Sequence, residues 1–87
     1  MATVCIPSLM RDLTHGQEQV EVAGRTLRQV LEAMEQAFPG AKARLCEAGR
    51  LKAGVMATVD GRAARLGLAQ PVGEASVIRF LPVLGGG

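Results

Sequence analysis

Apolar residues recur at helical spacing in one stretch of this chain and alternate with polar residues in several others. The helical stretch follows Thr26, a good N-cap with Gln29 three residues later, which is a capping-box pattern. Because Pro39-Gly40 stops a helix, the spacing predicts one amphipathic helix over residues 26–38. The apolar face of this helix is formed by Leu27, Val30, Leu31, Met34 and Phe38.

Period-two alternation and β-branched residues predict strands on both sides of the helix. The predicted strands cover residues 2–6, 19–22, 55–59, a short piece near 62–65, and 76–81. The first two are expected to pair as a hairpin, across a loop (residues 7–16) with one helical turn. Asp60-Gly61 is a tight-turn signal between the third and fourth strands. Residues 41–52 are expected to hold a short helical piece and a loop.

The element order predicts the fold class. One helix is available to cover one face of a single mixed sheet, which indicates an α+β protein. The order favours a β-grasp layout, with a four- to five-stranded sheet packed on one main helix and the last strand central, beside the first. In that last strand Ile78 and Phe80 should face the core, and Val77, Arg79 and Leu81 the exposed face.

The last strand gives way to Pro82-Val83-Leu84 and then to Gly85-Gly86-Gly87. Since glycine fills no core, we expect a β-grasp domain over residues 1–84 and a thin, flexible tail over 85–87. Such a tail fits a narrow channel of another protein, and the alternative is a frayed or engineered end. An extended segment from Pro82 to Gly87 would span about 20 Å, at about 3.3 Å per residue.

Composition narrows the classes of function. The 87 residues include two aromatics, and the scattered basic residues leave a net charge of +2, so nucleic-acid binding is disfavoured. No segment approaches the ~20 apolar residues of a membrane span, so we expect a cytoplasmic protein without membrane contacts. The basic residues between Lys42 and Lys52 are more typical of a solvated face than of a partner surface.

Candidate reactive side chains are few. Cys5 and Cys46 lack the spacing of a metal site or of a disulfide framework, so both are expected to be reduced, with Cys5 buried in the first strand. The single histidine, His15, precedes a turn glycine and is more typical of a surface turn than of a general base. An independent enzyme is therefore disfavoured.

Three motifs accompany the element order and the glycine end. They are a Met10-Arg11 pair followed by Leu13 and Thr14-His15-Gly16, then Val59-Asp60-Gly61, and Leu81-Pro82 before the tail. With them the chain resembles the MoaD/ThiS family of ubiquitin-like sulfur carriers over nearly its whole length. The departure is Gly85, because the usual tail has two glycines after a non-glycine residue.

The resemblance implies a protein substrate rather than an enzyme, with no permanently bound cofactor. A partner adenylating enzyme would use ATP and magnesium to activate the Gly87 carboxylate, with Gly86 beside it in the reacting end. A sulfur donor would then leave a thiocarboxylate, and a sulfur-accepting synthase would use it for molybdopterin, thiamine, cysteine or a similar product. As a small subunit of molybdopterin synthase, the chain would instead stay in one enzyme complex. The residues expected to contact partners are Val77, Arg79, Leu81, Pro82, Val83, Leu84 and Gly85.

Two other functions stay open at this point. A ubiquitin-like modifier would be joined through Gly87 to lysines of other proteins, and a β-grasp interaction module would not use its tail at all. The exposed apolar residues also have a structural alternative, in which Leu81 and Leu84 fold back onto the domain.

Overall fold

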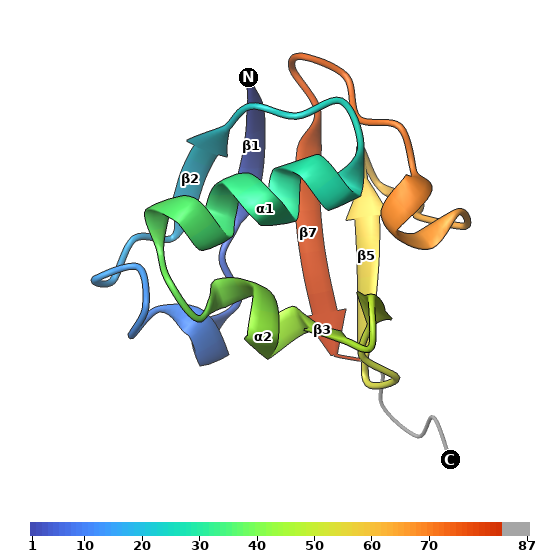
Figure 1. The fold of residues 1–87 in the computed structure, drawn as a ribbon. Helices are drawn as coiled ribbons and strands as arrows, with labels where there is room; N and C mark the ends of the chain where they lie inside the picture. The colour runs from blue at the N-terminus through green and yellow to red at the C-terminus, as the bar shows by residue number, and fades with distance from the viewer. Residues whose placement is uncertain (83–87) are drawn as a thin grey trace.

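The chain folds into a five-stranded mixed sheet with one long helix across one face, in a computed structural model that describes residues 1–82 (Figure 1). The strand order is β2-β1-β7-β5-β6. These strands are β1 (Ala2–Cys5), β2 (Gln19–Val22), β5 (Val55–Val59), β6 (Arg62–Ala63) and β7 (Val77–Pro82). A separate small hairpin pairs β3 (Cys46–Glu47) with β4 (Arg50–Leu51).

The pairing of the strands confirms the predicted β-grasp layout. β1 pairs antiparallel with β2 and parallel with β7, and β5 pairs antiparallel with both β7 and β6. β7 is therefore the middle strand, hydrogen-bonded on both sides. The turn from β5 to β6 has positive φ at Asp60 (53°) and Gly61 (83°), as a tight hairpin turn with a right-handed twist requires.

The main helix, α1 (Leu27–Ala37), begins at its predicted cap. Thr26 Oγ1 accepts a hydrogen bond from the Gln29 amide at 3.3 Å. Gln29 Oε1 accepts from the Arg25 amide at 2.8 Å, one residue earlier than in a standard capping box. The next helix, α2 (Ala41–Leu45), is the short helical piece expected after Pro39-Gly40.

The core lies between α1 and the sheet face that it covers (Figure 1). Ile78 and Phe80 of β7 face it, with 0% and 4% of their surface exposed, as the alternation predicted. The helix contributes Leu27, Val30, Leu31 and Met34. Two short 3-10 turns, η1 (Ser8–Met10) and η2 (Gly67–Ala69), add Met10 and Leu68 to the core, and η1 is the helical turn predicted in the first loop.

Two expectations need correction. The prediction of a buried Cys5 is wrong, because β1 points Ala2 and Val4 inward and leaves Cys5 half-buried on the outer face. The β3–β4 hairpin lies where only a helical piece and a loop were expected, since strands of two residues carry no readable periodicity. Neither α1 nor α2, the helices of residues 1–82, has the length and apolar character to cross a membrane.

Candidate functional site

The candidate site surrounds the end of β7, where the central strand leaves the sheet. The last described residue, Pro82, pairs with Val55 at the start of β5. This end of β7 lies near α2, because Phe80 and Leu81 line one pocket with Arg44 and Leu45. In Figure 1 it is at the opposite end of the sheet from the N-terminus. The predicted tail and the rest of the expected contact segment, Val83 to Gly87, lie outside the described residues.

The outer face of β7 carries the expected contact residues that the structure describes. Val77 is half-buried, Arg79 is exposed and Leu81 is 41% exposed. Met56 lies opposite Leu81 on β5 and is 40% exposed, so the two side chains form an apolar pair next to the end of the strand. Sequence reasoning missed Met56, although the period of its strand could have placed it on this face.

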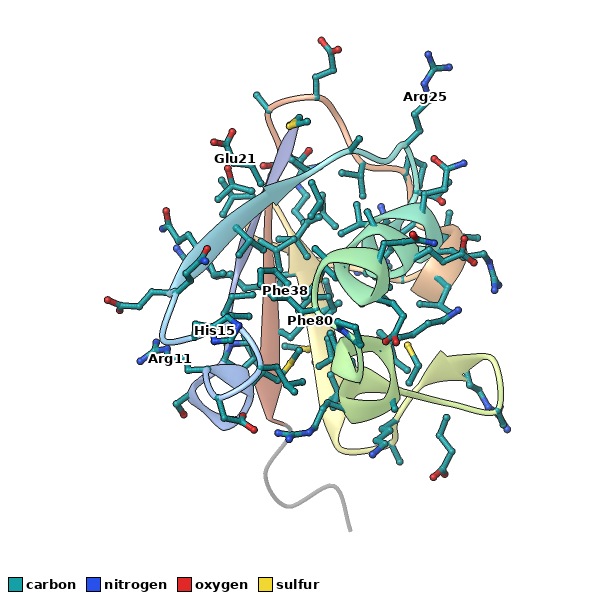
Figure 2. All side chains as sticks on the ribbon, turned by 60° about the vertical axis from the view of Figure 1, so that its left-hand side comes forward. Arg11, His15, Glu21, Arg25, Phe38 and Phe80 are labelled. Carbon is teal, nitrogen blue, oxygen red and sulfur yellow. The ribbon has the colours of Figure 1, made fainter. Side chains whose placement is uncertain are left out.

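A polar depression of about 260 Å³ lies between the first loop, β1 and β7. Its charged lining consists of Arg11, Glu18 and Arg79. Arg11 Nη2 lies 3.7 Å from Glu18 Oε1, whereas Arg11 Nε is buried and has no hydrogen-bond partner among residues 1–82. In Figure 2, Arg11 lies close to His15 on this loop, and His15 is an exposed turn residue with φ 56°, as predicted.

An apolar pocket of about 130 Å³ lies on the other side of Leu81. It shares Pro7, Phe80 and Leu81 with the polar depression. The remaining lining residues are Met10, Arg44, Leu45, Gly54 and Val55. The strand end is thus flanked by one polar and one apolar concavity, which is the kind of surface that a protein partner covers.

An exposed ion pair joins the first loop to α2 next to this apolar pocket. Arg44 of α2 donates from Nη1 and Nη2 to the two carboxylate oxygens of Asp12, at 3.3 and 2.9 Å. This hydrogen bonding lowers the pKa of the Asp12 carboxyl. Lys42 also has a carboxylate partner, Glu32, at 3.7 Å, so two of the basic residues between Lys42 and Lys52 are paired with carboxylates.

A second polar network fixes the start of β7. Asp60 accepts hydrogen bonds from the Val77 amide at 2.9 Å and from Ser76 Oγ at 2.8 Å. Ser76 Oγ in turn accepts from the Gly73 amide at 2.9 Å. The hydrogen bonds from Val77 and Ser76 lower the pKa of the Asp60 carboxyl. Both ends of the site-bearing strand are therefore positioned by contacts with neighbouring segments.

Comparison with known proteins confirms the resemblance to ubiquitin-like sulfur carriers. A family model described as the ThiS family matches residues 4–87. The sulfur carrier protein CysO of Mycobacterium tuberculosis is 32% identical over 90 residues, covering 98% of this chain and 97% of the relative. The CysO protein of Mycobacterium bovis matches equally well.

Solved structures extend the match to the fold. A chain in the crystal structure of the Amycolatopsis orientalis BexX/CysO complex superposes with a TM-score of 0.92 at 30% identity, covering 100% of both chains. Mycobacterium tuberculosis CysO gives the same TM-score and identity, covering 97% of this chain and 100% of that one. The small archaeal modifier protein 1 of Methanosarcina acetivorans, at 21% identity and a TM-score of 0.80, covering 99% and 95%, shares the fold.

The two CysO relatives at 32% identity are sulfur carrier proteins, and the family match runs through the glycine end of the sequence. The chain therefore belongs to the ThiS family of ubiquitin-like sulfur carriers.

Proposed function

We propose that this protein carries sulfur as a thiocarboxylate on Gly87. The observation that supports the proposal is a family match over residues 4–87, in which only Val83 and Leu84 stand in sequence between the central strand and the glycine end. A domain anchored by its middle strand can offer the following residues to a partner's active site without losing its own fold. Since the relatives at 32% identity are sulfur carriers, we prefer sulfur carriage to conjugation with lysines.

The chemistry explains why a partner must activate the chain end. A carboxylate is a poor electrophile because its negative charge repels nucleophiles. In an adenylating enzyme supplied with ATP and magnesium, a Gly87 carboxylate oxygen attacks the α-phosphorus and pyrophosphate leaves. A sulfide equivalent from a sulfur donor then attacks the acyl carbon, AMP leaves, and the thiocarboxylate remains. ATP and magnesium belong to the partner, and the carrier itself needs no resident cofactor.

The glycines suit this route for a steric reason. Gly87 has no Cβ to crowd the acyl carbon, and Gly86 and Gly85 allow the backbone to enter a slot too narrow for side chains. The residues before them, Pro82 to Leu84, then bridge the slot and the domain.

The domain docks on the adenylating enzyme through the outer face of β7. Leu81 and Met56 supply exposed apolar surface there, with Val77 and Arg79 on the same face. The acceptor is a synthase that takes the sulfur for molybdopterin, thiamine, cysteine or a similar product. We expect this cycle in the cytoplasm, where ATP is available to the activating enzyme.

Intact-protein mass spectrometry tests the proposal directly. The chain is isolated from its native cells under non-reducing, sulfide-free conditions, beside a matched variant that lacks Gly86 and Gly87. We expect the mass change of one oxygen replaced by sulfur in the full chain and no such change in the shortened variant.

Other results would refute sulfur carriage. Free carboxylate together with adducts on other proteins' lysines that survive thiol reductants would assign the modifier function. Full activity in cells after deletion of Gly86 and Gly87 would assign a purely structural interaction module.

A further inference from the structure

An exposed arginine occupies the middle of the face that is expected to meet partners. Arg79 lies between Cys5 of β1 and Thr58 of β5 in the sheet register, and both neighbours are uncharged. Within residues 1–82, no carboxylate lies within 4 Å of its guanidinium nitrogens. A cation placed on a central strand, two residues before Leu81, is therefore available to an external anion.

A second arginine lines the same depression and is only weakly engaged. The 3.7 Å ion pair between Arg11 and Glu18 joins side chains that are 43% and 75% exposed, and such surface pairs contribute little. The depression thus holds two guanidinium groups, from Arg11 and Arg79, against one carboxylate. Counted over the described part of the chain, the lining has a formal charge of +1, and Arg11 Nε has no acceptor there.

We propose that a carboxylate side chain of the adenylating partner binds between Arg11 and Arg79, with apolar residues of the partner covering Leu81 and Met56. The inference rests on the proposed function and identifies the partner surface that it requires. Guanidinium groups pair with carboxylates through two parallel N–H···O bonds, which fix orientation as well as position. The carboxylate orients the domain so that the residues after Pro82 point into the partner's channel.

The residues around Arg11 and Arg79 favour a protein over a nucleic acid as the binding partner. Leu81, Met56 and Pro7 next to them are aliphatic, and stacking of bases needs exposed aromatic or guanidinium platforms in series. The combination of an apolar pair and two cations is complementary to an acidic residue beside apolar ones. Such charge complementarity governs partner choice and association rate more than affinity alone.

The test measures binding of the full chain to the adenylating enzyme of the same organism, without ATP, at two salt concentrations. Arg79→Glu should weaken binding on the order of 100-fold and Arg79→Gln about tenfold, because the partner's carboxylate loses its counter-charge. Arg11→Glu should weaken binding in the same direction. Arg25→Glu is the matched control, because Arg25 is exposed and lies at the opposite end of the molecule from Arg11 (Figure 2).

The outcomes separate this inference from the proposed function. Equal affinity of the Arg79→Glu and Arg25→Glu chains overturns the inference, whether both bind like the unmodified chain or both bind equally more weakly, which marks non-specific attraction. Binding of an RNA oligonucleotide that is lost in Arg79→Glu, with enzyme binding unchanged, also overturns it. Restored binding of Arg79→Glu by a partner with one carboxylate reversed to arginine supports it.

ATP–pyrophosphate exchange with the same chains measures adenylation and so tests the proposed function. If the unmodified chain binds the enzyme more tightly than the Arg79 variants but is not adenylated, the proposed function is refuted and the inference about Arg79 is not. Thermal unfolding shows whether each variant is folded, and the neutral Arg79→Gln substitution on the exposed face keeps the test valid.

Discussion

Replacing Leu81 with aspartate tests whether the outer face of β7 is a binding surface. The side chain is 41% exposed, and its neighbour Met56 on β5 is also partly exposed. An aspartate at this position remains hydrated in the free domain. Under a partner it would be desolvated among apolar groups, so the substitution should affect binding more strongly than folding.

The exposed fraction sets the expected magnitudes. Full burial of a leucine side chain is worth about 1.5–3 kcal/mol, so the buried three-fifths of Leu81 contribute roughly 0.9–1.8 kcal/mol to folding. The remaining two-fifths would add roughly 0.6–1.2 kcal/mol when a partner covers them. An unpaired polar group in the interface costs about a further 1–3 kcal/mol. Binding should therefore weaken by about 2–4 kcal/mol, or roughly 30- to 1,000-fold.

Two measurements on the same variants check this difference. Urea denaturation gives the free energy of unfolding, and titration with the adenylating enzyme gives the dissociation constant. Leu66→Asp serves as the control, because Leu66 is 63% exposed and lies next to η2 rather than on the outer face of β7. An affinity of the Leu81→Asp chain equal to that of the Leu66→Asp chain would refute the docking surface.

Three further predictions address the chain end, the network at the start of β7 and the core. Deletion of Gly86 and Gly87 should abolish adenylation in an ATP–pyrophosphate exchange assay and leave the melting temperature unchanged; residual exchange would show that adenylation does not need these two glycines. In the folded protein the pKa of Asp60 is lowered below its usual 3.8, so its stabilising effect is present above that pH and lost as pH falls through the folded value. The unmodified protein should therefore exceed Asp60→Asn in free energy of unfolding by less below about pH 4 than above it, as denaturation at a series of pH values measures. A difference that does not change with pH would contradict this. Ile78→Ala removes a fully buried side chain from β7 and should lower the free energy of unfolding by about 2–5 kcal/mol while adenylation of the folded fraction continues; a loss of less than about 1 kcal/mol would mean that the site is not tightly packed.

Local patterns predicted the elements that present the site. Helix α1 follows from its N-cap and from apolar residues at helical spacing, and the faces of β7 follow from alternation around Arg79. The central position of β7 followed from the element order, because that order favours a β-grasp layout in which the last strand lies centrally beside the first. Periodicity was enough to predict a helix or strand where the element was long enough to repeat its pattern of apolar residues.

Contacts between distant segments escaped the sequence reasoning. Asp12 and Arg44 are 32 residues apart, and the fold alone brings them together beside the apolar pocket. Arg11 and Arg79 line one depression for the same reason, because the first loop packs next to β7. Such pairs produce no periodic pattern in the sequence, because the strand order and the course of the loops determine which distant residues meet.

The position of β7 separates the stability of this carrier from its chemistry. β1 pairs with residues 77–79 of the strand, β5 pairs with residues 78–82, and the Asp60 network holds the start of the strand. A partner that pulls on the end of β7 therefore has to break contacts with β5 first and with β1 before the strand leaves the sheet. The inward residues Ile78 and Phe80 anchor the strand in the core, whereas Arg79 and Leu81 face outward toward a partner. Substitutions on the inner face should therefore change the population of folded carrier, and substitutions on the outer face should change which enzyme it meets. A substitution at Arg79 that altered both equally would show that the two faces of the strand are coupled through the sheet.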